Sequence, residues 1–182
     1  MFKTKMALCA LLVSAASSSA FAAGEVTQGT VTFNGKLIAE TCSIVSDNQN
    51  LTVTLPTLSI ASLAATGNEA GSKTFDIKVE KCPTTITDVA AHFEAINSDG
   101  FDAVTKNLTN SVPAASNPAK NVEIRLYDKD GKTQLPVGST GGFFTPDNSG
   151  NATLTYMGGY YATGATTAGP VAAKVAYTLA YK

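Results

Sequence analysis

His92 is the only histidine in the 182-residue sequence, which makes it the first candidate for acid–base chemistry. It stands in an alternating segment in which Ala91 and Phe93 would point to the opposite face of a strand, so we expect the imidazole to face solvent. A serine activated by His92 would need a nucleophile-elbow pattern such as G-x-S-x-G, which the sequence does not contain. A zinc site needs several His or Cys ligands, and these are too few. We therefore expect no catalytic or metal site at His92.

The segment Asp128-Lys129-Asp130-Gly131 is the second place where side chains could hold an ion. An EF-hand loop needs acids at positions 1, 3 and 5, glycine at 6 and glutamate at 12. Here glycine follows the second acid directly, and no acid stands at the later position, so we expect a hairpin turn. The sequence contains no glycine-rich phosphate loop either. These patterns predict a protein that is not an enzyme and carries no cofactor.

The N-terminus has the pattern of an export signal. Lys3 and Lys5 precede a short apolar run, residues 6–13, which is followed by small residues up to Ala22. Such a pattern predicts a signal peptide over residues 1–22 that is removed after export. A lipoprotein with Cys9 as its lipidated residue is the alternative, although the apolar run continues past this cysteine.

Cys42 and Cys82 are the only cysteines that remain after residues 1–22 are removed. An exported chain reaches an oxidising compartment, so a disulfide between them is the first expectation. Such a bond would close a loop of about 40 residues and stabilise the fold by roughly 4 kcal/mol in the chain-entropy treatment. Free thiols or a metal-binding pair are the alternatives.

The charge balance bears on which partners the protein can have. Two of the 13 basic residues lie in the predicted signal, which leaves 11 basic against 14 acidic residues and a net charge of −3. The basic residues are scattered rather than clustered. Nucleic acid and anionic membrane surfaces are therefore not expected as partners.

Apolar residues alternate with polar ones along most of the chain, and spacing typical of helices is scarce. The pattern predicts an all-β sandwich in a single domain, with one short helical stretch at 58–65 and a bulge at Gly158-Gly159 in the penultimate strand. The predicted strands cover residues 30–35, 51–55, 75–79, 89–96, 122–126, a strand that begins at 154, and 175–181.

The first and last predicted strands have unusual positions at the two ends of the mature chain. Near the N-terminus, Gly29, Val31 and Phe33 share one face of the predicted strand. The side chains on this face are large at positions 31 and 33, and position 29 has none. An ordinary first strand of the sandwich would explain this pattern on its own. Near the C-terminus, Tyr177 and Tyr181 lie on a strand followed only by Lys182. Such a terminal strand presents an edge on which another strand can add.

Several features occur together and in order. The segment Gly29-Thr30-Val31-Thr32-Phe33-Asn34-Gly35 precedes Cys42, and a second cysteine follows 40 residues later. The segment 159–164 reads Gly-Tyr-Tyr-Ala-Thr-Gly, Gly169 is the fourteenth residue from the end, and Tyr181 is the penultimate one. In this conjunction the whole mature chain resembles the chaperone–usher fimbrial pilins, in particular the major subunits of type 1-like fimbriae.

The resemblance implies an incomplete immunoglobulin-like β-sandwich, residues 36–182, that lacks its last strand. It implies that residues 23–35 form a donor strand, with Gly29, Val31 and Phe33 facing the groove of a neighbouring subunit. A periplasmic chaperone, and then an identical subunit added at the outer-membrane usher, would bind along the C-terminal segment, with Gly169, Tyr177, Leu179 and Tyr181 as site residues. The product would be an adhesive homopolymeric surface fibre, with minor tip subunits as further partners.

Three other functions remain as alternatives. The first is a minor adaptor subunit of the same fibre. The second is a free secreted carbohydrate-binding sandwich, for which Tyr160 and Tyr161 would be the exposed aromatic residues. The third is a secreted hydrolase, for which the sequence offers no catalytic residues.

Overall fold

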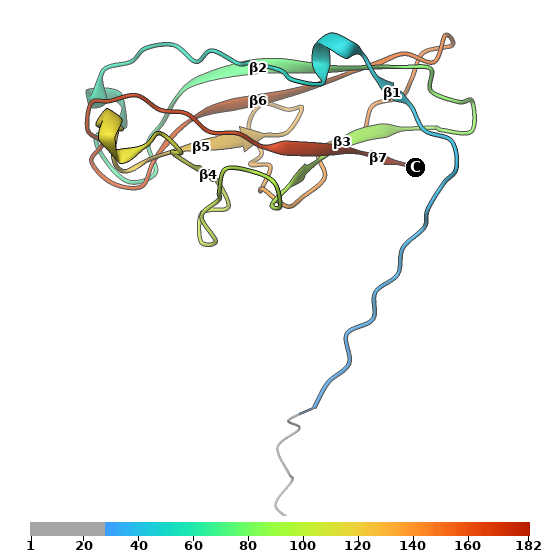
Figure 1. Cartoon of the computed structure of the whole chain (residues 1–182), viewed down its shortest axis with the longest axis horizontal. Coiled ribbons are helices and arrows are strands. Elements are labelled where there is room, and N and C mark those ends of the chain that lie inside the picture. The colour runs from blue at the N-terminus through green and yellow to red at the C-terminus, as the bar shows by residue number, and fades with distance from the viewer. Residues whose placement is uncertain (1–27) are drawn as a thin grey trace, which may run out of the picture. The chain divides into compact units, whose positions relative to one another are not determined.

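A computed structural model describes residues 28–182 of the chain (Figure 1). The predicted signal peptide, residues 1–22, lies outside the described part. The chain divides after Leu37 into an N-terminal unit and a compact body, residues 38–182. Residues 28–37 form no helix or strand, and every one of them is exposed.

The larger of two antiparallel sheets contains five strands in the order β1-β2-β6-β5-β4. Its long central pair, β2 and β6, is joined over nine residue pairs and confirms the strands predicted at 75–79 and from 154 onward. The prediction at 122–126 is confirmed by β5. The five strands are β1 (Ser43–Ile44), β2 (Glu69–Glu80), β4 (Leu108–Thr109), β5 (Val122–Tyr127) and β6 (Ala152–Ala162).

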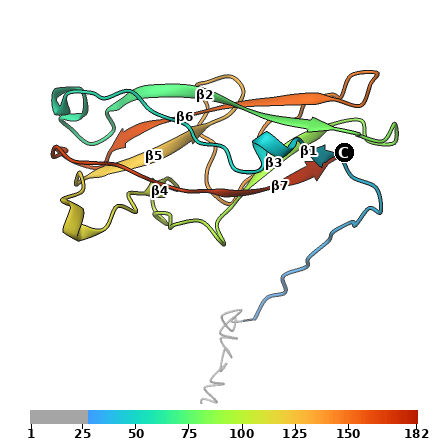
Figure 2. The same cartoon turned by 45° about the horizontal axis from the view of Figure 1, so that its top comes forward.

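The smaller sheet pairs β3 (Val89–Glu94) with β7 (Ala176–Tyr181), the last strand of the chain. On its other edge, β3 bonds to the segment 138–144 through main-chain groups, although that segment contains only isolated bridges. Figures 1 and 2 show the two sheets as separate layers. The strands predicted at 89–96 and 175–181 are therefore confirmed.

Alternating apolar side chains from both sheets fill the space between the layers. Phe93 of β3 meets Tyr156 of β6 edge-on, with ring centroids 5.3 Å apart, and meets Phe75 of β2 at 6.2 Å. Ile77 and Leu154, at most 1% exposed, pack in the same cluster. Each such side chain contributes about 1.5–3 kcal/mol by leaving water, so this inter-sheet core holds the body together.

Two buried tyrosines make the fold sensitive to alkaline pH. Burial raises the pKa of Tyr156 to about 12, and burial together with Glu69 raises the pKa of Tyr127 to about 12. Unfolded tyrosines titrate near pH 10, so the folded state favours the neutral phenols. We expect stability to be unaffected by these groups below about pH 10 and to fall between about pH 10 and pH 12. Urea unfolding at a series of alkaline pH values tests this, and Tyr156→Phe should reduce the decline; an unchanged decline would exclude Tyr156 as a cause.

Two predicted strands are not present as strands. Residues 30–35 and 51–55 are extended, but neither has a strand partner within residues 28–182. Alternation describes which side chains could be buried, whereas a strand also needs a neighbour that satisfies its main-chain groups.

The predicted helix at 58–65 is shorter than expected. Only the 3-10 turn Ile60–Leu63 forms, and Ser59 caps it by accepting a hydrogen bond from the Ala61 N–H at 3.3 Å.

The predicted bulge lies on the other strand of the pair. β6 runs without interruption through Gly158 and Gly159, and the register shift is in β2, between Ala70 and Lys73. Two residues of β2, Gly71 and Ser72, therefore stand opposite one residue of β6. A Cβ atom at Gly159 would lie 2.9 Å from the Ser72 Cα. Gly159 is therefore needed so that the bulged part of β2 can approach the β6 backbone closely, and it does not interrupt β6 itself.

Candidate functional site

The residues considered above for acid–base chemistry or ion binding, His92 and Asp128–Gly131, have structural roles. His92 lies on β3, where its Nδ1 is 2.8 Å from the Thr140 hydroxyl, and its side chain is about one-third exposed. Asp128–Gly131 forms a turn closed by a hydrogen bond from the Gly131 N–H to the Asp128 carbonyl at 2.8 Å. Within residues 28–182 no three His, Cys, Asp or Glu side chains are grouped so that they could hold a metal.

The two predicted cysteines meet in the body. Cys42 and Cys82 form a disulfide with an S–S distance of 2.07 Å. The bond joins the residue before β1 to a residue just after β2. These two strands are neighbours, because β1 pairs with the C-terminal end of β2. Both cysteines are buried at one end of the inter-sheet core. The disulfide thus fixes the start of the body next to the sheet.

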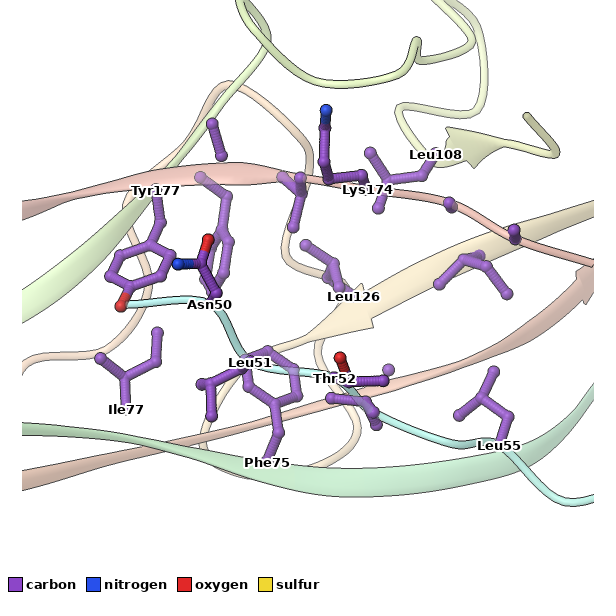
Figure 3. A pocket seen from close by; sticks show the side chains of 18 of the residues that line it. Asn50, Leu51, Thr52, Leu55, Phe75, Ile77, Leu108, Leu126, Lys174 and Tyr177 are labelled. Atoms are coloured by element: carbon purple, nitrogen blue, oxygen red, sulfur yellow. The ribbon is translucent and has the colours of Figure 1, made fainter. Parts of the chain in front are cut away.

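A long groove of about 890 Å³ lies between residues 49–55 and residues 171–177. Side chains of the larger sheet, Phe75, Ile77 and Leu126, line this groove, and Figure 3 shows Leu126 between the two segments. Almost all of the residues that line the groove are uncharged. Phe75, Ile124 and Val175 are the core side chains that remain partly exposed along the groove, whereas Ile77 and Leu126 are buried beneath it.

The main chain of β7 uses only one of its two edges. The odd-numbered residues of β3 bond away from β7: the Val89 N–H donates to the Phe144 carbonyl at 2.9 Å, and the Phe93 N–H donates to Ser139 at 3.0 Å. Even-numbered residues of β3 therefore bond to even-numbered residues of β7, because alternate residues of a strand direct their main-chain groups to opposite edges. It follows that the main-chain groups of Tyr177, Leu179 and Tyr181 point to the free edge of β7, which borders the groove at Tyr177.

The segment before β7 continues this arrangement. The carbonyls of Pro170, Ala172 and Lys174 accept hydrogen bonds from the N–H groups of Ala119 (3.1 Å), Ser111 (2.8 Å) and Asp99 (3.0 Å), all on the side away from the groove. The intervening Val171, Ala173 and Val175 therefore direct their N–H and C=O groups into it. No partner for these groups occurs within residues 28–182. One wall of the groove is thus a long unpaired strand edge.

The opposite wall, residues 50–55, is also unpaired. No main-chain hydrogen bond joins it to another part of the described chain, and its one carbonyl contact is with the Lys73 ammonium, 3.2 Å from the Thr54 oxygen. Leu51 is 38% exposed although it faces the apolar groove. A strand placed between the two walls could bond to both of them. This explains why a segment with a clear strand pattern is not a strand here.

Asn110 holds the C-terminal wall in place, and sequence reasoning missed this residue. Its amide NH₂ donates to the carbonyls of Ala119 (3.0 Å) and Pro170 (3.1 Å), and its side-chain oxygen accepts from Val112 (3.2 Å) and Ala172 (3.1 Å). Four hydrogen bonds from one side chain tie the wall to the loop 110–119. The only sequence signal is a position in a loop rich in turn residues, which does not indicate a partner 60 residues away.

Gly169 lies where the chain enters this wall. Its φ is +156°, and a Cβ atom would stand 2.4 Å from the Ala119 nitrogen and 2.6 Å from the Asn117 carbonyl oxygen. Residues that have a side chain rarely adopt this backbone conformation. The atoms nearest to the added Cβ belong to the main chain, which cannot move aside without displacing the loop. The structure therefore assigns Gly169 a steric role in placing the wall.

We expect Gly169→Ala to lower the free energy of unfolding by about 3 kcal/mol, since backbone strain and overpacking each cost about 1–3 kcal/mol. The matched control is Gly164→Ala in the same loop, where the nearest atom to a new Cβ is 3.5 Å away. Denaturant unfolding of the two variants measures the difference. Equal stabilities would contradict the steric role of Gly169.

The predicted C-terminal site residues lie together on β7. Tyr177, Leu179 and Tyr181 pack their side chains against the inter-sheet core and are half-buried. The Tyr177 hydroxyl donates to the Asn48 carbonyl at 2.8 Å, which ties β7 to the chain that leads into the other wall. Burial raises the pKa of Tyr177. Of the three, Tyr177 lines the groove, and the main-chain groups of all three point to the free edge of β7.

The two tyrosines of the carbohydrate-binding alternative do not form one platform. Tyr160 lines the groove, whereas the Tyr161 ring lies under the Arg125 guanidinium, 3.8 Å from its centroid. Neighbouring residues of a strand point to opposite faces, so the two rings cannot stack on a single sugar. Their positions explain both as packing residues.

The predicted donor residues lie in the N-terminal unit. Val31 is 79% exposed and Phe33 is 91% exposed, and a Cβ atom at Gly29 would have no neighbour within 4 Å. Leu37, also on the odd-numbered side, is 99% exposed. Large apolar side chains are usually found inside a protein, so this regular exposed series is a feature to be explained.

Within residues 28–182 no helix is of the length and apolarity that crossing a bilayer requires.

Comparison with known proteins identifies the family. The chain matches the family described as "Fimbrial protein" over residues 28–182. It is 41% identical to the F17 fimbrial protein of Escherichia coli over 179 residues, covering 94% of this chain and 95% of that protein. It is 36% identical to the major fimbrial subunit SMF-1 of Stenotrophomonas maltophilia, covering 87% and 95%.

Among solved structures, a chaperone–usher pilus is similar with a TM-score of 0.61 at 21% identity, covering 85% of this chain and 96% of the other. This likeness in fold confirms the predicted all-β, incomplete immunoglobulin-like sandwich. With a family match over the whole described part and a relative 41% identical along nearly its full length, this chain belongs to the fimbrial proteins and is a structural subunit of a fimbria on the bacterial surface.

Proposed function

We propose that the subunit polymerises by donating residues 23–35 to the groove of the next copy, while its own groove receives the same segment from another copy. The observation that carries this proposal is the pair of unpaired main-chain walls, 50–55 and 171–177, on either side of an apolar groove. A donated strand would satisfy both walls at once. The protein then acts only as a structural unit and catalyses no reaction.

The exposed face of the donor segment has the chemistry that the groove requires. The groove floor is apolar, and Val31 and Phe33 are large apolar side chains that the single chain leaves in water. Burying each contributes about 1.5–3 kcal/mol. Each new main-chain hydrogen bond adds about 0.5–1.5 kcal/mol. Gly29, without a side chain, allows the two backbones to approach where the groove is shallow.

The open groove also supports a role for a periplasmic chaperone. An unpaired strand edge above an apolar surface attracts other chains nonspecifically and promotes aggregation. A chaperone strand bound along β7 and residues 171–175 would cover it until the outer-membrane usher presents the next subunit. Gly169 and Asn110 keep this wall in place, and Tyr177, Leu179 and Tyr181 supply the main-chain groups that pair.

The repeating shaft position suits this subunit better than an adaptor position. A shaft subunit needs both a groove and a donor segment, and residues 28–182 carry a groove and an exposed alternating segment. Similarity to a protein described as a major fimbrial subunit favours the same role. Identical subunits would then be its main partners, with minor subunits at the tip.

A peptide with the sequence of residues 23–35 tests the proposal in trans. We expect it to raise the melting temperature of the freshly refolded mature chain and to block polymerisation, because a ligand that binds only the folded state stabilises it by mass action. The matched control is the same peptide with aspartate in place of Phe33. A melting temperature that responds equally to both peptides, or to neither, would refute insertion of this segment into the groove.

A further inference from the structure

Asn34-Gly35 is the only Asn-Gly pair in the sequence, and it lies inside the exposed N-terminal segment. Both residues are exposed and outside any helix, strand or turn, and a Cβ atom at Gly35 would have no neighbour within 4 Å. Neither residue makes a hydrogen bond within the described part of the chain. Glycine at this position leaves the backbone free to rotate. This is the arrangement in which an asparagine side chain and the next main-chain nitrogen can meet.

We infer that Asn34 is a deamidation site whose modification distinguishes unassembled from assembled subunits. The Gly35 main-chain nitrogen attacks the Asn34 Cγ, forming a new N–C bond. The Cγ–Nδ2 bond breaks, and the amide nitrogen leaves as ammonia with the proton from Gly35. Water then opens the resulting succinimide at either carbonyl and gives aspartate or isoaspartate. No oxidant, reductant or enzyme is required.

The two Asp-Gly pairs of the chain could form the same ring but are held by hydrogen bonds and an ion pair. The Asp130 carboxylate accepts hydrogen bonds from the N–H groups of Lys132 (2.9 Å) and Thr133 (2.8 Å), and the Gly131 N–H is bonded in the turn. Asp99, before Gly100, is paired with Lys174 at 3.2 Å and accepts from the Ser111 hydroxyl at 3.1 Å. Ring closure there would break these contacts. They serve as internal controls for Asn34.

The consequence for assembly rests on the donor-strand proposal. Isoaspartate inserts an extra carbon into the main chain and so breaks the two-residue alternation after Phe33. A donor strand with that insertion cannot keep Phe33 and the following residues in register with both walls. Within a fibre, the paired strand would hold the Gly35 N–H and its backbone fixed, which prevents ring closure. Deamidation would therefore remove subunits that wait too long before assembly.

The test compares two pools of wild-type protein, freshly refolded mature chain kept dilute and unpolymerised, and purified fibres. Both are incubated at mildly alkaline pH and digested after lysine, which releases the N-terminal peptide ending at Lys36. We expect isoaspartate at Asn34 to form several-fold faster in the unpolymerised chain than in fibres. The peptides that contain Asp99 and Asp130 should stay unmodified. Asn34→Gln should abolish the signal, because its longer side chain closes the ring poorly.

The outcomes separate the two proposals. No isoaspartate at Asn34 in the unpolymerised chain would overturn the modification site and leave the donor strand untouched. Equal rates in both pools would leave the site standing but overturn its protection by assembly, and with it the burial of residues 23–35 in the fibre. A recovered isoaspartate pool that joins fibres as well as fresh protein would overturn the effect on assembly. Asn34→Asp, which adds charge but no extra main-chain carbon, should assemble several-fold better than that pool.

Discussion

Replacing Phe33 with aspartate should stop fibre growth almost completely. The exposed ring is the largest side chain on the odd-numbered face of the donor segment. In the neighbouring groove it would be buried, so its removal costs about 1.5–3 kcal/mol. A carboxylate in its place would also lose its hydration without a partner, which adds several kcal/mol. Since 1.4 kcal/mol is a factor of ten, polymerisation should weaken by more than about 100-fold.

Thr32→Asp is the matched control for Phe33→Asp. It adds the same charge one residue away, on the face of the donor segment that would point to solvent. Its cost should stay within the strand-propensity range of about 1 kcal/mol, or roughly fivefold. Electron microscopy of sheared surface fibres, with periplasmic subunit levels measured in parallel, provides the readout. Fibres of normal length and number from Phe33→Asp would contradict the donor role of this face.

Replacing both cysteines with alanine should lower the free energy of unfolding by about 4 kcal/mol. Cys42 and Cys82 are 40 residues apart, and a loop of that length gives roughly this stabilisation in the chain-entropy treatment. A body with an open groove lacks the contacts of its missing strand and has little stability to spare. Most single domains have only about 5–15 kcal/mol in total. The variant should therefore be largely unfolded or degraded in the periplasm.

Reduction of the wild type gives an independent check on the disulfide prediction. A thiol reductant should bring the unfolding midpoint of the wild type down to that of the double variant and should leave the double variant unchanged. Urea titrations with and without reductant measure both effects. If the wild type keeps its midpoint when its thiols are shown to be reduced, the disulfide does not stabilise the body as proposed.

The strand pattern was readable from the sequence for the longer strands that have a partner in the same chain, whereas the two-residue strands β1 and β4 were not predicted. Residues 75–79, 122–126 and 176–181 alternate, and each finds a neighbour that satisfies its main chain. Residues 51–55 alternate just as clearly, yet they form no strand, because the neighbour that they need is not supplied within the described chain. The pattern reports which side chains can be buried and does not report whether a partner is present.

The glycines illustrate a second limit. Gly158-Gly159 suggested a bulge in β6, whereas the extra residue is in β2, opposite Gly159. A glycine can allow irregularity in its own strand or close approach by another strand, and only the packed pair distinguishes the two. Asn110 was missed for a similar reason, since the carbonyls it binds come from a segment far away in the sequence.

Local chemistry determined several properties of this protein before any folding was considered: its alternating β composition, its two cysteines in an oxidising compartment, and the apolar face of residues 29–33. Only the tertiary structure decided that an open groove runs between residues 50–55 and 171–177 and that the main-chain groups of Tyr177, Leu179 and Tyr181 point to the free edge of β7. The physical reason is that side-chain alternation is a property of one segment. The direction in which a main chain finds its hydrogen bonds, by contrast, depends on which strand lies on its other side.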